Sequence, residues 1–209
     1  MSGQVPNYKL QLKIKSFPRI HISLIGMNND GYRINGGVGF SISQPTLICS
    51  FNASSDVEII DKRKNKFTPD EIERLKLTIE ECRYINNLKS SIRCTINGDS
   101  SPHYGLGSNT AIYLSCIEGI LILNDFSYSN ETLINLSKRG GTSGIGINTY
   151  FNGGFVFDLG IKSENKLLHP SSISDRDGVS PSVLLKKKSL DWPIGLCIPK
   201  QIENKTEDE

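Results

Sequence analysis

The sequence of 209 residues has no apolar run long enough to cross a membrane. Its longest apolar stretch, residues 117–123, is interrupted by Glu118 and is far shorter than the ~20 residues that a membrane-spanning helix needs. The N-terminal residues also lack the uninterrupted apolar core and small-residue cleavage site of a signal peptide. We therefore expect a cytoplasmic protein with no membrane partner.

The sequence also lacks a strong excess of charge of one sign. It has 24 lysines and arginines against 22 aspartates and glutamates, for a net charge of +2. Proteins that bind nucleic acid normally carry a basic stripe, so no nucleic-acid partner is expected. Any anionic ligand would have to be held by local groups.

The cysteines form no CxxC pair, and their number, five, is odd. Neither a zinc site nor a disulfide framework is therefore predicted, and we interpret the cysteines as small core residues. They are Cys49, Cys82, Cys94, Cys116 and Cys197.

Apolar and polar residues alternate in several segments, which predicts half-buried strands. A helix is predicted after TPDE, with Thr68 as N-cap, Pro69 at the first helical position and Glu71 completing a capping box. Two more helices are expected at about residues 108–123, apolar on nearly all sides, and 129–139, with Ser129 or Asn130 as the cap of the second. The expected strands include residues 10–17, 19–26, 44–51, 91–96, 155–160 and a buried one starting at 191, with a solvated loop at 61–66 and a loop at 168–190.

The segment PHYGLGSNT, residues 102–110, connects a predicted strand to a predicted buried helix. Backbone N–H groups at a helix N-terminus attract anions, and glycine lets a ligand approach them closely, so this segment suits a phosphate. Its spacing matches neither a Walker loop nor a Rossmann motif. A turn without a ligand explains the same residues equally well.

A second glycine-rich segment, residues 139–146, combines the guanidinium of Arg139 with the hydroxyls of Thr142 and Ser143. These groups could hold an oxyanion, although a tight turn is the simpler explanation. A third glycine turn, INGGVG at residues 34–39, lies in the same chain.

The segments RIHISLIGMNNDGYRINGGVGFSI, PHYGLGSNT, RGGTSGIGINTYFNGGFVFDLG, HPSSIS and DWPIGLCIP, in this order, resemble the beta-ribofuranosylaminobenzene 5'-phosphate synthase (beta-RFAP synthase) family of the GHMP kinase superfamily. The resemblance implies an α+β fold, a GHMP-type N-terminal domain with a mostly antiparallel sheet and helices packed on one face. It also implies condensation of phosphoribosyl pyrophosphate with 4-hydroxybenzoate or 4-aminobenzoate, with release of pyrophosphate and CO2, in tetrahydromethanopterin biosynthesis.

The resemblance assigns candidate roles to particular residues. Arg33 or Arg139 would pair with a phosphate or with the aromatic carboxylate, and His21 or His103 would donate or accept a proton. For each histidine taken alone, a hydrogen-bonded structural role is the alternative. The catalytic candidates are Arg19, His21, Arg33, His103 and Arg139; the phosphate- or substrate-binding candidates are Gly105, Leu106, Gly107, Ser108, Asn109, Gly141, Thr142, Ser143 and Gly144.

Mg2+ is expected with the pyrophosphate and no organic cofactor is expected, but no metal-ligand cluster is evident in the sequence. Two positions depart from the family pattern: Gly26, where an acid is usual, and Ala111, where a glutamine often stands. Loss of the acid puts catalysis in doubt, and Asp30 lies near it in the sequence.

Family members continue into a second domain. Residues 1–188 are therefore expected to form the N-terminal domain, and residues 189–209 the first strand of a truncated second domain followed by a disordered acidic tail. The partner would be a second copy of the chain or a separate C-terminal-domain chain. Two alternatives stay open: an ATP-dependent small-molecule kinase of the GHMP superfamily, and a catalytically silent binding subunit.

Overall fold

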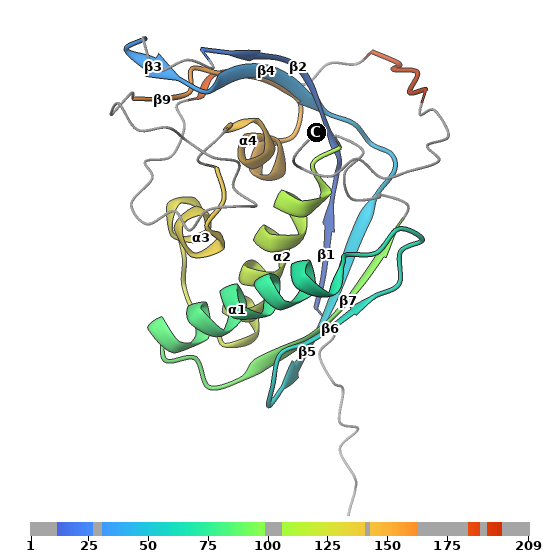
Figure 1. Cartoon of the computed structure of the whole chain (residues 1–209), viewed down its shortest axis with the longest axis vertical. Coiled ribbons are helices and arrows are strands. Elements are labelled where there is room, and N and C mark those ends of the chain that lie inside the picture. Colours follow the sequence, from blue (N-terminus) through green and yellow to red (C-terminus); the bar gives the residue numbers. More distant parts are fainter. Residues whose placement is uncertain are drawn as a thin grey trace, which may run out of the picture.

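A computed structural model of the chain describes residues 12–26, 31–98, 106–140, 143–162, 184–188 and 192–197. Two four-stranded sheets and four helices form the described part of the protein, with α2 (Ser108–Leu123) packed on the first sheet and α4 (Ile145–Asn152) on the second (Figure 1). The fold is α+β, as the sequence predicts.

The first sheet has the strand order β1–β5–β7–β6. Its strands are β1 (Leu12–Ser16), β5 (Leu47–Ser54), β7 (Ser91–Gly98) and β6 (Glu58–Asp61). All neighbours are antiparallel except β6 and β7. Along β5, Leu47, Cys49 and Phe51 are buried in alternation with less buried residues, because successive side chains of a strand point to opposite faces. This alternation gives the sheet one face that packs against helices.

The second sheet has the order β10–β8–β4–β2 and is antiparallel throughout. It contains β10 (Leu184–Lys188), β8 (Phe155–Asp158), β4 (Gly36–Ser41) and β2 (Arg19–Ile25), and a small pair, β3 (Arg33–Ile34) with β9 (Ile161–Lys162), extends from it. A Cβ atom at Gly39 would lie 2.6 Å from Ile145 Cγ2 and from the carbonyl of Ile20. The glycines of β4 therefore allow the helix that follows the second glycine-rich segment to pack directly on the sheet.

Two helices, α1 (Pro69–Ile85) and α3 (Asn130–Ser137), begin as their sequences predict. At α1, the Glu71 N–H donates to Thr68 Oγ1 at 3.3 Å and the Thr68 N–H donates to Glu71 Oε2 at 2.8 Å, which completes the capping box. At α3, the N-cap is Ser129, whose Oγ accepts the N–H of Thr132 at 3.1 Å.

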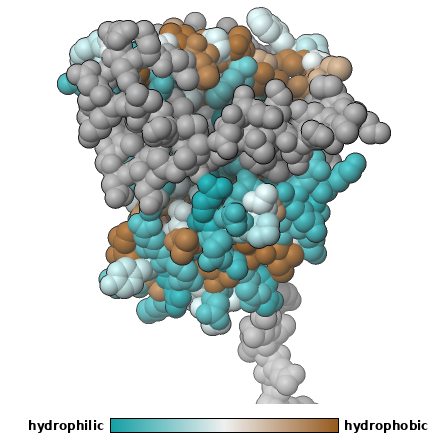
Figure 2. All heavy atoms as spheres, viewed as in Figure 1, coloured by the Kyte–Doolittle hydropathy of each residue, from teal (hydrophilic) through white to brown (hydrophobic). Residues whose placement is uncertain are grey.

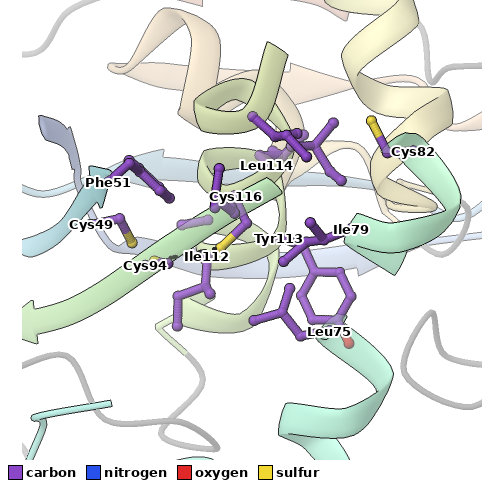
Figure 3. Close-up of a cluster of buried hydrophobic side chains, with 14 of the residues drawn as sticks. Cys49, Phe51, Leu75, Ile79, Cys82, Cys94, Ile112, Tyr113, Leu114 and Cys116 are labelled. Carbon is purple, nitrogen blue, oxygen red and sulfur yellow. Dashed lines mark hydrogen bonds between the residues drawn. The ribbon is translucent and has the colours of Figure 1, made fainter. Parts of the chain in front are cut away.

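The central helix α2 (Ser108–Leu123) is buried on nearly all sides between the first sheet, α1 and α3. The aromatic ring of Phe51 fills the place of a side chain at Gly119, where a Cβ would lie 2.9 Å from the ring. Figure 3 shows the thiols of Cys49, Cys94 and Cys116 together in this core, and the Cys94 and Cys116 sulfurs are 3.8 Å apart.

Interpretation of the cysteines as core residues is correct for four of the five, because Cys197 is exposed. Burial raises the pKa of Cys82 to about 12, which keeps this thiol protonated. The buried thiols are therefore unreactive packing groups.

Three local predictions are wrong. Residues 61–66 are not simply a solvated loop, because Arg63 is 2% exposed and its Nε and Nη2 bind the carboxylate of Asp61 at 2.9 and 2.6 Å. The buried strand expected from residue 191 does not form, since residues 192–197 are exposed and have no regular structure. The predicted loop at 168–190 contains β10.

The described residues contain no helix long and apolar enough to cross a membrane.

Hydrophilic side chains dominate the lower part of the face in Figure 2, whereas apolar ones gather at the top, where β2 and β4 lie in Figure 1. The edge strand β2 exposes Ile22, Leu24 and Ile25.

Candidate anion-binding site

The site is centred on Arg19, the first residue of β2. Its guanidinium lies against two glycines from different parts of the chain. A Cβ atom at Gly146 would lie 3.0 Å from Arg19 Nε and 3.2 Å from Cζ, and a Cβ at Gly107 would overlap the guanidinium. These two glycines belong to the N-terminal ends of α4 (Ile145–Asn152) and α2. The absence of both side chains therefore creates the space that holds the cation between two helix N-termini.

The backbone holds α2 in this position. The Arg19 N–H donates to the carbonyl of Leu106 at 3.0 Å, so the residue just before the helix is fixed to the start of β2. Gly107 is the N-cap in the left-handed conformation, with φ of 72°, which favours glycine. No side chain caps this helix end, an arrangement that suits an anionic ligand.

A second guanidinium lies close to the first. Arg139 is 8% exposed, and its Cζ is 3.7 Å from the centroid of the Tyr113 ring. Burial, followed by repulsion from Arg139, lowers the pKa of Arg19 to about 10. Arg19 therefore stays charged at neutral pH although Arg139 repels it, so an anion beside Arg19 would be strongly favoured.

His21 lies on the same face of β2 as Arg19. Burial, followed by the charge of Arg19, lowers the pKa of His21 to about 4, which makes the imidazole neutral at pH 7. Among the described residues, no hydrogen-bond partner is present for the buried Nε2 of His21, Nε of Arg19 or Oδ1 of Asn109. Buried polar atoms are normally paired, so these three atoms mark a place where a ligand can supply hydrogen bonds.

The described residues provide no carboxylate that binds Arg19 or His21, because the charge that acts on each of them comes from an arginine. No group of three acidic, histidine or cysteine residues with the geometry of a metal site occurs in the described part of the chain. Within the part of the chain that the structure describes, the charge of Arg19 is therefore not balanced by an acidic side chain.

A buried acid that the sequence reasoning missed organises the second glycine-rich segment. Asp158, at the end of β8, is fully buried, and its Oδ2 accepts the N–H of Gly144 at 2.7 Å. Its Oδ1 accepts the N–H of Gly160 at 2.9 Å, and Ser143 Oγ accepts the N–H of Ile145 at 3.3 Å. The signal in the sequence was an aspartate ending the apolar strand FVFD. Asp158 fixes the beginning of α4, and with it the position of Gly146.

Arg33 is engaged elsewhere in the structure. Its Nε and Nη2 donate to the carbonyls of Leu159 and Gly160 at 3.2 and 2.6 Å, between β8 and β9. It supports the backbone next to Asp158, and the structure does not bring it into contact with Arg19. A direct role in binding an anion stays a prediction.

The two positions that depart from the family pattern have structural explanations. Gly26 has a φ of 65°, and its carbonyl accepts the N–H of Asn35 at 2.9 Å, so a larger residue there would be strained. Ala111 lies in the buried part of α2 and is 7% exposed. Asp30 lies outside the described residues.

The structure brings most of the predicted residues together at one place, where β2 meets the beginnings of α2 and α4. Gly146, Asp158 and Tyr113 join the site although the sequence did not single them out. The predicted residues found there are Arg19, His21, Leu106, Gly107, Ser108, Asn109, Arg139, Ser143 and Gly144. His103, Gly105, Gly141 and Thr142 lie outside the described residues.

Comparison with known proteins gives consistent relatives. The beta-ribofuranosylphenol 5'-phosphate synthase of Methanothermobacter thermautotrophicus is 30% identical over 198 residues, which cover 91% of this chain and 59% of that protein. The synthase of the same name from Methanocaldococcus jannaschii is 29% identical over 202 residues, covering 90% of this chain and 59% of that protein. The chain thus spans less than two thirds of the length of these relatives. No family model matches it.

Solved structures with a similar fold include two kinases of mevalonate metabolism. Phosphomevalonate kinase of Streptococcus pneumoniae has a TM-score of 0.56 and 14% identity, over 74% of this chain and 50% of that one. Mevalonate kinase of Staphylococcus aureus has a TM-score of 0.52 and 17% identity, over 87% and 57%. At such identities the likeness shows the fold alone, and it confirms the predicted GHMP kinase-type architecture.

Proposed function

We propose, from the premise that this chain is homologous to the beta-ribofuranosylphenol 5'-phosphate synthases and has the GHMP kinase fold, that it binds the phosphorylated donor of such a synthase. The donor is phosphoribosyl pyrophosphate, and the acceptor is 4-hydroxybenzoate or 4-aminobenzoate. The observation that carries this proposal is that Arg19 lies near a second arginine, Arg139. No carboxylate among the described residues acts on Arg19. The reaction belongs to a cytoplasmic pathway to tetrahydromethanopterin.

The proposed reaction requires stabilisation of a leaving pyrophosphate. The bond between ribose C1 and the pyrophosphate oxygen breaks, and its electron pair leaves with the pyrophosphate. The ring carbon that bears the carboxylate bonds to C1, CO2 is released, and the electron pair of the broken bond restores the aromatic ring. The two guanidiniums and the helix N-termini beside Gly107 and Gly146 would stabilise the charge that develops on the pyrophosphate.

His21 has a narrower role in this proposal than the sequence suggests. With its pKa lowered to about 4, the ring is not a cationic proton donor at neutral pH in the absence of a ligand. A neutral imidazole can donate one hydrogen bond to a phosphate or the ribose, or accept one from a hydroxyl. Mg2+ would enter as the pyrophosphate complex, because the described residues offer no acidic cluster to hold it.

The site is less suited to the kinase alternative. Transfer of a phosphoryl group to a hydroxyl commonly uses a carboxylate to orient or deprotonate the hydroxyl. The buried acid of the site, Asp158, instead binds the amides of Gly144 and Gly160. The structure therefore supports electrostatic binding of an anion better than activation of a hydroxyl.

Two measurements test the proposal. Calorimetry with the purified chain should show binding of phosphoribosyl pyrophosphate that is lost in Arg19→Met and kept in Arg93→Met, which removes only an exposed ion pair with Glu58. Release of pyrophosphate and CO2 should then be followed with either benzoate. Because the chain covers 59% of the first relative, the assay is repeated with a second polypeptide that supplies the remaining part of that relative.

The outcomes separate the three functions. Pyrophosphate and CO2 release, with or without the added polypeptide, supports the synthase. Formation of ADP from ATP and a metabolite, without turnover of the benzoate pair, would contradict it in favour of a kinase. Binding of the donor with no turnover in either assay would mean that the chain is a binding subunit.

A further inference from the structure

A second feature next to Arg19 has no assigned role: an open cavity of about 560 Å3 between the second sheet and residues 192–197. Its apolar lining residues include Phe17, Ile42, Trp192, Ile194 and Leu196. Trp192 is 72% exposed and Phe17 43%, which leaves two aromatic rings open to a ligand. Exposed apolar groups gathered around a hollow commonly mark a binding site.

The cavity and the anion-binding site are neighbours on one face of the second sheet. Ser41, which lines the cavity, lies directly opposite Arg19 in the antiparallel pair of β2 and β4, and the Ile42 N–H donates to the carbonyl of Pro18 at 2.9 Å. Residues opposite each other in such a pair have their Cβ atoms about 5 Å apart on the same face. The wall of the cavity therefore begins at the backbone of Arg19.

Helix α4 connects the two sites from the other side. Its N-terminal end holds the Arg19 guanidinium at Gly146, and its C-terminal end lines the cavity at Gly153 and Gly154. The Gly154 N–H donates to Ser41 Oγ at 2.7 Å, which fixes this end of the helix to β4. With a rise of about 1.5 Å per residue, the two ends of the helix are roughly 10 Å apart, a distance that one ribose phosphate with an attached ring can span.

The residues around the cavity favour a neutral aromatic group. None of the described residues that line it carries a charge, and its polar side chains are Ser41, Ser43 and Gln44. Burying a carboxylate among such groups is costly, whereas a phenol or aniline needs only hydrogen-bond partners. The relatives are named for a ribofuranosylphenol, whose ring must lie beside the ribose.

We propose that this cavity binds the aromatic acceptor, with its 4-hydroxyl or 4-amino group toward Ser43 and Gln44 and its carboxylate toward Arg19. The inference rests on the proposed function. In this orientation the carboxylate-bearing carbon, which must bond to ribose C1, is the ring atom closest to the phosphate site. The ring itself lies between Phe17 and Trp192. The two substrates thus meet at the start of β2.

The chain contains one tryptophan, Trp192, so its fluorescence reports directly on the cavity. Titration of the chain with 4-hydroxybenzoate, with pyrophosphate present, should quench this fluorescence in a saturable manner. Ser43→Phe, at an exposed position in the cavity wall, should fill the space and weaken 4-hydroxybenzoate binding at least tenfold. Leu77→Phe, on the exposed side of α1, is the matched control and should bind like the wild type.

A second variant tests the orientation. Gln44→Leu removes a hydrogen-bonding group from the cavity, and it should reduce the preference for 4-hydroxybenzoate over unsubstituted benzoate. Quenching that does not saturate, or equal affinities in Ser43→Phe and the wild type, would overturn the inference. The same holds if the polypeptide that supplies the rest of the relative blocks the quenching by covering the cavity.

Calorimetry with phosphoribosyl pyrophosphate keeps the two proposals separate. Donor binding that persists in Ser43→Phe, together with weaker 4-hydroxybenzoate binding, supports a distinct acceptor site. Donor binding without any aromatic binding by the wild type contradicts the cavity proposal and leaves the proposed function standing. Aromatic binding in the cavity without donor binding supports the acceptor site and contradicts the proposed function.

Discussion

Replacement of Arg19 by methionine should stabilise the protein without ligand and abolish its response to pyrophosphate. Burial and the nearby Arg139 lower the pKa of Arg19 to about 10, between two and three units below the ordinary value of a guanidinium. Since each pKa unit is worth about 1.36 kcal/mol, the charge costs the folded state up to roughly 3 kcal/mol. The side chain is not completely buried, so the remaining contact with solvent reduces this cost to about 1–2 kcal/mol.

Methionine keeps a comparable apolar stem between Gly107 and Gly146 but carries no charge. Without ligand, the variant should therefore melt a few degrees higher than the wild type, at about 2–4 °C per kcal/mol for a chain of this size. Pyrophosphate at one hundred times its dissociation constant should stabilise the wild type by about 2.7 kcal/mol and leave the variant unchanged.

Thermal unfolding with and without pyrophosphate measures both effects. Arg93→Met is the control: it loses an exposed ion pair with Glu58, worth at most about 1 kcal/mol, and should keep the full response to pyrophosphate. A variant at position 19 that melts lower than the wild type and still responds to pyrophosphate would refute the reasoning, because Arg19 would then be a structural residue.

Three further predictions follow from the site and the core. Gly146→Ala, whose Cβ would lie 3.0 Å from Arg19 Nε, should weaken pyrophosphate binding by roughly tenfold in calorimetry, with little loss of stability because alanine favours a helix. NMR titration should give His21 a pKa near 4 in the free protein and a higher value with pyrophosphate. The His21 ring of the unfolded chain takes up its proton at a higher pH than that of the folded protein, so the free energy of unfolding should fall as the pH drops from about 6.5 toward 4. A pKa near 6.5 for His21 in the free protein would contradict the burial of the ring. A thiol reagent should modify Cys197 quickly in the native protein and the other four cysteines only after unfolding; fast native reaction of a second thiol would contradict the core packing.

Local signals in the sequence predicted much of the fold. The capping box at Thr68, the N-cap at Ser129 and the apolar α2 are all present, because each depends on residues close together in the chain. The helix α4 was not predicted, because its glycine-rich sequence hides a helix that packing against the glycines of β4 makes possible. Likewise the burial of Arg63 depends on its pairing with Asp61, which charge counting does not reveal.

The site was predicted as a set of residue types but not as a geometry. Glycine-rich segments suggested phosphate binding at residues 105–109 and 141–144, and both helix N-termini do lie at Arg19. The guanidinium of Arg19 occupies the space left by Gly107 and Gly146. These glycines follow Arg19 in the sequence by 88 and 127 positions, so no local pattern reveals the contact. The role of Asp158 was equally hidden, since its partner amides at Gly144 and Gly160 are known only from the folded chain.

The arrangement of charge explains why the site can favour pyrophosphate as it leaves. Arg19 keeps its charge although burial disfavours the charged form, whereas burial and the charge of Arg19 keep His21 neutral. The buried carboxylate of Asp158 is already bound to backbone amides. Among the described residues no carboxylate acts on Arg19, so an arriving phosphate would not have to displace one there or reorganise the helix ends. The buried charge of Arg19 raises the free energy of the ligand-free protein, and a bound anion offsets this cost. The offset is largest when negative charge increases beside Arg19, as it does on a departing pyrophosphate.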